Sequence, residues 1–171
     1  MPRQLTFDLL RQLADGAFHS GEKLAAQFGI SRASVHNALR DVANYGLVLH
    51  RVRGRGYRLA RAMQWLDAAA IKQQLDAGTA VQLEILDQAT STNAMLLERA
   101  AQGAPSGKVL AAEWQSAGRG RLGRTWHAGL GDALTFSLLW RFACGPGGLS
   151  GLSLAVGVAV LRALQELGVH G

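Results

Sequence analysis

The chain has 171 residues, of which 49% are apolar and 18% are charged, and this composition supports a folded core and excludes a disordered tail. The length suits one ordinary domain or two small ones. The single cysteine, Cys144, excludes an intramolecular disulfide and a cysteine-based zinc site, and the sequence predicts no other metal site.

The net charge of +6 is confined to the first third of the chain. Residues 1–61 hold ten Lys/Arg and four Asp/Glu, whereas residues 62–171 hold eight of each kind. The asymmetry indicates a basic module, whose natural partner is a polyanion, joined to a neutral module. A basic surface that serves only solubility is the alternative interpretation.

Two stretches bear on the question of membranes. Residues 1–5 lack the apolar core of a signal peptide. The longest uncharged stretch, residues 142–161, has the length of a membrane span, but its Gly145-Pro146-Gly147-Gly148 segment is turn chemistry. We therefore expect a soluble, cytoplasmic protein with no membrane partner.

The basic module is predicted as three helices followed by a β-ribbon. Apolar residues recur at helical spacing within residues 5–13, 24–28 and 35–42. Ser20 and Ser31 are placed to cap the second and third helices, and only Gly29-Ile30 separates the second helix from Ser31. A tight glycine-containing joint between two short helices is typical of the helix-turn-helix.

The outward face of the third helix and the ribbon after it indicate contact with DNA. Residues 47–53 form a basic, β-branched strand, residues 54–56 a turn, and residues 57–59 the returning strand, which together make a wing. The sequence therefore predicts a winged helix-turn-helix DNA-binding domain over residues 1–61. The candidate DNA contacts are Ser31, Arg32, His36, Asn37, Arg40, Arg53 and Arg55.

The neutral module alternates strands and helices, which indicates an α/β or α+β fold without fixing the strand order. A linking helix over residues 62–76, ended by Gly78, leads into it, and a long helix from Ser150 to Leu167, ended by Gly168, closes it. The elements predicted between these helices are strands at 81–86, 109–114 and 133–140 and a helix from Ser91 or Thr92 to Ala101.

The segment between the second and third strands, residues 115–126, is the most unusual. It holds three glycines and three arginines within residues 118–124, a combination that suits binding of an anion by backbone N–H groups and guanidinium groups. A flexible basic loop, or an Arg-Gly contact to nucleic acid, is the alternative. Gly118–Gly123 formally matches G-x-G-x-x-G, but no helical pattern follows and Trp140 stands where the fingerprint needs an acid.

These segments together resemble the bifunctional biotin–protein ligase and biotin-operon repressor family, over the whole chain. The resemblance rests on Thr90-Ser91-Thr92-Asn93, on Glu113-Trp114-Gln115, and on Gly118–Trp126, which is similar to the family's G-R-G-R-x-G-R-x-W loop. It implies an α+β chain in which the winged helix-turn-helix precedes the first part of a mixed-sheet α/β catalytic domain at residues 79–171.

The same resemblance implies the activity and the partners. Biotin and ATP, with Mg²⁺, would form biotinyl-5′-adenylate, and the biotinyl group would pass to a lysine of the biotin carboxyl carrier protein of acetyl-CoA carboxylase. The adenylate would also promote formation of a homodimer that binds operator DNA and represses the biotin operon.

Site residues follow position by position from the resemblance. Ser, Thr, Asn and Gln side chains suit a fused polar ring on an apolar wall, although Ser91 and Thr92 can equally be helix caps alone. The implied biotin contacts are Ser91, Thr92, Asn93, Gln115, Arg119, Gly120 and Arg121. The implied adenylate and phosphate contacts are Gly118, Gly123, Arg124 and Trp126.

One family feature has no match, and it leaves the catalytic residue unassigned. The family's Lys-Trp-Pro-Asn-Asp segment, whose lysine contacts biotin and phosphate, would lie beyond Gly171, so we expect a shortened chain with little ligase activity. A ligand-sensing winged-helix regulator without catalysis is the main alternative. Lipoate or octanoate transfer shares the catalytic architecture but fits the Gly-Arg loop and the DNA module less well.

Overall fold

The computed structural model describes residues 4–76 and 78–169, apart from the side chains of Arg121 and Pro146. It divides into two compact units, Met1–Leu139 and Trp140–Gly171. The first unit holds both the basic module and a three-stranded sheet, and the second holds one long helix.

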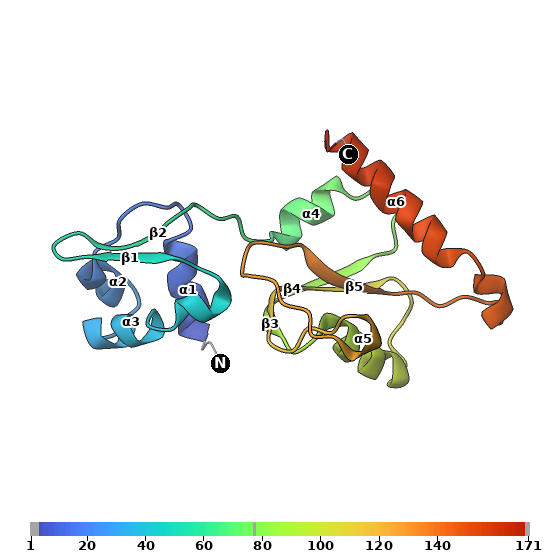
Figure 1. Ribbon diagram of the computed structural model, residues 1–171, viewed down its shortest axis with the longest axis horizontal. Helices are drawn as coiled ribbons and strands as arrows, with labels where there is room; N and C mark the ends of the chain where they lie inside the picture. Colours follow the sequence, from blue (N-terminus) through green and yellow to red (C-terminus); the bar gives the residue numbers. More distant parts are fainter. Residues whose placement is uncertain (1–3, 77, 170–171) are drawn as a thin grey trace. The chain divides into compact units, whose positions relative to one another are not determined.

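The basic module folds as a winged helix-turn-helix, as predicted. Its elements are α1 (Gln4–Gln12), α2 (Gly21–Gln27), α3 (Arg32–Ala38), β1 (Leu49–Val52) and β2 (Gly56–Leu59), with the antiparallel β1–β2 ribbon beside the three helices (Figure 1). The hydroxyl of Ser20 accepts the N–H of Glu22, and the hydroxyl of Ser31 accepts the N–H of Ser34. Both predicted N-caps are therefore confirmed.

The third helix is shorter than the apolar spacing predicts. It ends at Ala38, and a 3₁₀ helix, Val42–Tyr45, carries the remaining apolar residues to the core. Arg51 of β1 donates from Nη2 to the carbonyls of Leu39 (2.7 Å) and Arg40 (3.2 Å). These carbonyls lack helical partners at the helix end, so a guanidinium from the ribbon stabilises the break.

The predicted linking helix over residues 62–76 is wrong for its first half and at its end. The helix observed, α4 (Ala68–Gln74), begins after Asp67, whose Oδ1 accepts the N–H groups of Ala69 and Ala70, and it ends before Gly78. Met63 and Trp65 instead pack against the winged-helix core, where Trp65 meets Phe7 edge to face. Residues 62–67 form no helix, which suits this packing because two residues that are two apart on a helix point in different directions and would not both reach the core.

The neutral module contains a mixed sheet, which confirms the α+β class. The strands β3 (Gln82–Ala89) and β4 (Lys108–Gln115) are parallel, and β5 (Thr135–Leu139) pairs antiparallel with β4, in the order β3-β4-β5. The helix α5 (Thr92–Ala101) connects β3 to β4 and packs against β4 and β5 (Figure 1). This crossover brings the carboxyl ends of the two parallel strands to one edge of the sheet.

The second unit consists of a 3₁₀ turn, Pro146–Leu149, and the helix α6 (Leu152–Glu166). The helix begins after Gly151, at φ +88°, rather than at the predicted Ser150, and the predicted stop at Gly168 has φ +77°. Residues Gly147–Glu166 are long and apolar enough to cross a membrane by length and composition. One such helix is weak evidence for a span, since core helices of soluble proteins meet the same criterion.

Candidate functional site

The two segments predicted to contact a ligand lie side by side at the carboxyl ends of β3 and β4. Ala89 and Gln115 are opposite each other in the parallel register. Beyond them, the N–H of Ser116 donates to the carbonyl of Ala89, and the N–H of Ala117 donates to the carbonyl of Thr90, both at 2.9 Å. The carboxyl edge of parallel strands is where α/β sheets bind ligands.

A polar cluster lies at this edge, with Thr92 buried and both Gln115 and Ser137 partly buried. Thr92, the first residue of α5, is 2% exposed, and its N–H donates to Oε1 of Gln115 at 2.7 Å. The hydroxyl of Thr92 also contacts Oε1 of Gln115 (3.2 Å) and the hydroxyl of Ser137 (2.8 Å). Ser137 was not among the predicted site residues, because only the pairing of β5 with β4 brings it to Thr92.

The other residues predicted in these segments take different positions. The hydroxyl of Ser91 accepts the N–H of Ala94 at 3.4 Å, so Ser91 caps α5 in this structure. Asn93 is exposed on the first turn of α5. The structure thus joins Thr92 to Gln115 directly and keeps Ser91 beside them as the helix cap.

The Gly-Arg loop, residues 118–126, is a short hairpin rather than an unstructured stretch. The N–H of Gly120 donates to the carbonyl of Arg124 (2.7 Å), and the N–H of Trp126 donates to the carbonyl of Gly118 (2.9 Å). A Cβ at Gly118 would lie 2.6 Å from the carbonyl oxygen of Trp126, so only glycine fits there. Residues 124–134, directly after the 3₁₀ turn Arg121–Gly123, contain no helix, as the absence of a helical pattern there predicts.

The tip of this hairpin is open and positively charged. Leu122 is 95% exposed, and a surface hollow of about 540 Å³ is lined by Gly120, Leu122, Arg124, Thr125 and Trp126. Within the described part of the chain, no acidic side chain pairs with Arg119 or Arg124. The side chain of Arg121, another predicted contact, lies outside the description. The arrangement leaves at least two guanidinium groups available to an anion.

The segment after the loop, at Leu130, packs into the hydrophobic core of the winged helix. The N–H of Leu130 donates to the carbonyl of Tyr45 at 2.8 Å, and the Leu130 side chain, 1% exposed, belongs to the same buried cluster as α1 and α3. Arg61 forms an ion pair with Asp132, and Tyr45 packs edge to face on Trp114 at 5.1 Å. Sequence reasoning missed this contact, since no local pattern indicates which core Leu130 joins.

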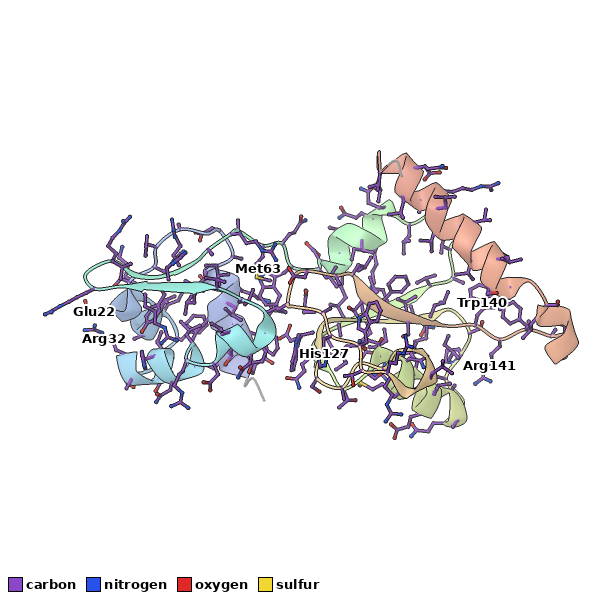
Figure 2. The ribbon with its side chains drawn as sticks, in the orientation of Figure 1. Glu22, Arg32, Met63, His127, Trp140 and Arg141 are labelled. Atoms are coloured by element: carbon purple, nitrogen blue, oxygen red, sulfur yellow. The ribbon has the colours of Figure 1, made fainter. Side chains whose placement is uncertain are left out.

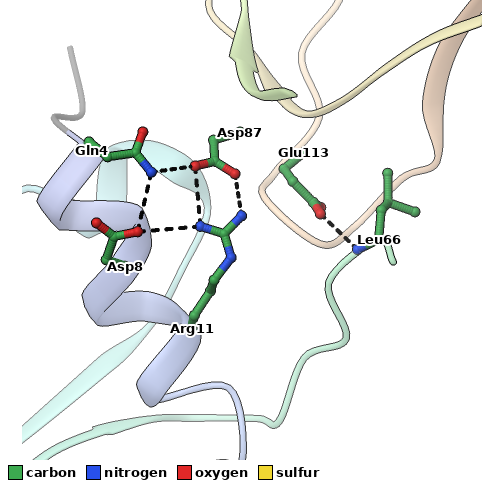
Figure 3. A network of polar contacts seen from close by, with 6 residues as sticks. All are labelled: Gln4, Asp8, Arg11, Leu66, Asp87 and Glu113. Atoms are coloured by element: carbon green, nitrogen blue, oxygen red, sulfur yellow. Dashed lines mark hydrogen bonds and ion pairs between the residues drawn. The ribbon is translucent and has the colours of Figure 1, made fainter. Parts of the chain in front are cut away.

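A polar network links α1 to the sheet beside this contact (Figure 3). Gln4 and Arg11 both donate to the carboxylate of Asp87 on β3, and Oε1 of Glu113 on β4 accepts the N–H of Leu66 at 2.7 Å. Burial would raise the pKa of Asp87, but the hydrogen bonds from Arg11 and Gln4 outweigh it and lower the pKa. Burial raises the pKa of Glu113, only partly offset by the N–H of Leu66.

The candidate DNA face lies between α2, α3 and the wing. Ser31, Arg32, His36, Asn37 and Arg40 are exposed on or beside α3, and Arg53 and Arg55 are exposed at the wing. A groove of about 470 Å³ separates the two sets, lined in part by Glu22, Arg32 and His36 on one side and by Arg51, Arg53 and Arg55 on the other.

Two contacts organise the cations of this face. Arg32 pairs with Glu22 at 2.9 Å (Figure 2), while Arg55 and Arg58 stack on the ring of Phe18, with their guanidinium carbons 4.2 and 4.9 Å from its centroid. Phe18 was not predicted to contribute. The cation–π contacts of both arginines with one ring hold their guanidinium groups in place, which preorganises the wing for phosphates.

Comparison with known proteins identifies the family. The model of the biotin/lipoate A/B protein ligase family matches residues 85–171, and a helix-turn-helix domain model matches residues 6–58. The chain belongs to the biotin/lipoate A/B protein ligase family. The resemblance inferred from the sequence, a ligase region behind a helix-turn-helix, is therefore confirmed.

Individual relatives within the family are also similar. The bifunctional ligase/repressor BirA of Salmonella typhimurium is 41% identical over 160 residues, and that of Escherichia coli is 40% identical over 160 residues; each alignment covers 94% of this chain and 49% of the relative. The biotin–[acetyl-CoA-carboxylase] ligase of Mycobacterium tuberculosis is 45% identical over 106 residues, covering 60% of this chain and 40% of the relative. The chain thus spans about half the length of these relatives.

Proposed function

We propose that the gene product that carries this sequence activates biotin with ATP to biotinyl-5′-adenylate and transfers the biotinyl group to a lysine of a biotin carboxyl carrier protein. The observation that carries this proposal is the junction at the carboxyl ends of β3 and β4. There a partly buried Thr92–Gln115 cluster, suited to a polar ring, adjoins a hairpin with two available guanidinium groups, suited to phosphate.

Different residues of the junction bind biotin and the nucleotide during formation of the adenylate. Thr92, Gln115 and the neighbouring Ser91 and Asn93 hold the ring of biotin, and Arg119, Gly120 and Arg121 close over it. Gly118, Gly123, Arg124 and Trp126 face the nucleotide, where guanidinium and N–H donors stabilise the charge that builds on the α-phosphoryl oxygens as pyrophosphate leaves. Mg²⁺ enters with the ATP phosphates as part of the substrate.

The helix-turn-helix supports a second proposed activity, which is repression of the biotin operon when the adenylate is bound. The exposed cations of α3 and of the wing bind operator DNA, with Arg55 of the wing held against Phe18, and a homodimer formed with the adenylate supplies two such faces. Biotin, ATP and DNA are all available in the cytoplasm, where we place the protein.

Lipoate ligation is the competing reaction, because the family model spans both biotin and lipoate enzymes. The names of the similar relatives favour biotin, since they are a ligase/repressor and a biotin–[acetyl-CoA-carboxylase] ligase. A sensor without catalysis shares the helix-turn-helix but has no need of a phosphate-binding hairpin beside the ring pocket.

The test is transfer of labelled biotin to a carrier protein by the gene product that carries this sequence. We expect ATP-dependent labelling with biotin, none with lipoate, and a loss of about tenfold or more on Arg119→Ala, since a charged hydrogen bond contributes about 1.5–3 kcal/mol. Arg162→Ala, an exposed arginine of α6, is the control. Labelling with lipoate alone, or DNA binding without any labelling, would overturn the proposal.

A further inference from the structure

The orientation of the Gln115 amide is fixed by its neighbours. The backbone N–H of Thr92 lies 2.7 Å from one terminal atom of the Gln115 side chain, and a backbone N–H can only donate. That atom is therefore the carbonyl oxygen Oε1, and the amide nitrogen Nε2 must point the other way.

The same reasoning sets the direction of each hydroxyl. The carbonyl oxygen of Gln115 cannot donate, so the Thr92 hydroxyl must donate its single hydrogen to Oε1 in the 3.2 Å contact. In the 2.8 Å contact between the hydroxyls of Thr92 and Ser137, Ser137 must then be the donor. A chain of hydrogen bonds runs from Ser137 through Thr92 to Gln115.

The far end of this chain faces the Gly-Arg hairpin. Nε2 of Gln115 lies where an added Cβ at Gly118 would approach it to 3.1 Å. Among the residues that the structure describes, none accepts a hydrogen bond from Nε2. The two N–H donors of Nε2 are thereby held beside the hairpin, because Oε1 of the same Gln115 side chain already accepts hydrogen bonds from Thr92.

We propose that Ser137 is a positioning residue that, through Thr92, holds the Gln115 amide with its NH₂ group directed at an acceptor oxygen of the ligand. The inference rests on the proposed function and deepens it, because a cyclic urea carbonyl is a strong acceptor and a dithiolane ring presents only weakly accepting sulfur. Thr92, the middle member of the chain, is almost fully buried, so water competes little for its hydroxyl. Ser137 thus contributes to selection of a ureido ring over a lipoyl ring.

The test compares two ligands on Ser137→Ala. Biotin carries the ring carbonyl, whereas its diamine analogue, in which the urea is opened to two amines, lacks it. We expect the affinity for biotin to fall about three- to tenfold, the amount that one neutral hydrogen bond contributes, while the affinity for the diamine changes less than about twofold. The KM for biotin should rise with the KM for ATP unchanged.

Two further variants separate positioning from folding. Ser137→Thr keeps the hydroxyl on a β-strand and should restore biotin affinity. Ser106→Ala, in the turn before β4 and at the other end of that strand from Gln115, should leave both affinities unchanged. Equal losses for biotin and the diamine, or no loss for either, would overturn the role of Ser137. Absence of biotin binding by the unsubstituted protein would instead overturn the proposed function.

Discussion

At the scale of single residues, the contact between α1 and the sheet holds two acidic side chains whose pKa values are shifted in opposite directions. Asp87 receives donors from Arg11 and Gln4, and its pKa is lowered. Glu113, 7% exposed, receives one backbone N–H, and burial raises its pKa. The carboxylate of Asp87 therefore stabilises the fold at neutral pH, whereas the charge on Glu113 opposes it.

Replacing Glu113 with Gln should raise the free energy of unfolding at pH 7. The amide oxygen still accepts the N–H of Leu66, and the buried charge is gone. Because a raised folded-state pKa means that the folded protein binds the proton more tightly, the unfavourable contribution of Glu113 disappears as pH falls through that pKa. The gain should shrink between pH 7 and pH 4.5, as measured by urea denaturation.

The matched control is Glu98→Gln on α5, an exposed acid, which should change stability by less than about 0.5 kcal/mol. A Glu113→Gln protein that is less stable than the parent by the same amount at both pH values would contradict this account of Glu113.

At the scale of elements, the two N-caps of the basic module could be predicted from local sequence, whereas features that depend on tertiary contacts could not. Ser20 and Ser31 were predicted as caps because a cap depends on the next three residues. The end of α3 could not be predicted, since Arg51 reaches its carbonyls from another element. The role of Ser137 depends on strand order, and alternating strands and helices do not fix that order. The contribution of Phe18 could not be predicted either, because its contact with Arg55 and Arg58 joins segments that are distant in the sequence.

The Gly-Arg hairpin should show a graded pattern of hydrogen exchange. The amides of Gly120 and Trp126 are hydrogen-bonded and should be partly protected without ligand, whereas that of the exposed Leu122 should not be. Biotinyl-5′-adenylate should slow exchange across residues 118–126, because an anion relieves repulsion between Arg119 and Arg124. Exchange that is identical with and without adenylate would count against the role of the loop.

The wing should bind phosphate. Arg55→Ala should weaken binding to duplex DNA by about 1 kcal/mol and reduce the slope of log affinity against log salt by about one unit, if Arg55 makes one phosphate contact. Binding is measured by fluorescence anisotropy at several salt concentrations, with Arg162→Ala as control. An unchanged slope for Arg55→Ala would show that its stacking on Phe18 serves only the fold.

At the scale of the first unit, the winged helix and the ligase module share one core. Leu130, four residues after the Gly-Arg loop, completes the cluster formed by α1, α3 and the ribbon, and Trp114 of β4 packs on Tyr45. The residue before Gln115 and the segment after the loop are thus both held by the DNA-binding module. These two contacts join the DNA-binding module to both segments that flank the Gly-Arg loop.

Leu130→Ala should lower the free energy of unfolding by about 2–5 kcal/mol, the cost of removing a fully buried leucine side chain. Leu122→Ala is the matched control, because Leu122 is exposed and should cost less than about 0.5 kcal/mol. Both are measured by denaturation with a tryptophan fluorescence signal. Similar small losses for the two variants would show that the shared core contributes little.

The central claim, that the carboxyl edge of β3 and β4 with its Gly-Arg hairpin binds biotin and its adenylate, is tested most directly by calorimetry. Biotin, biotinyl-5′-adenylate and lipoate are titrated in parallel into the gene product that carries this sequence. We expect biotin to bind, the adenylate to bind more tightly because the arginines of the hairpin engage its phosphate, and lipoate to give no measurable heat. Lipoate binding as tight as biotin, or an adenylate that binds no better than biotin, would contradict the claim.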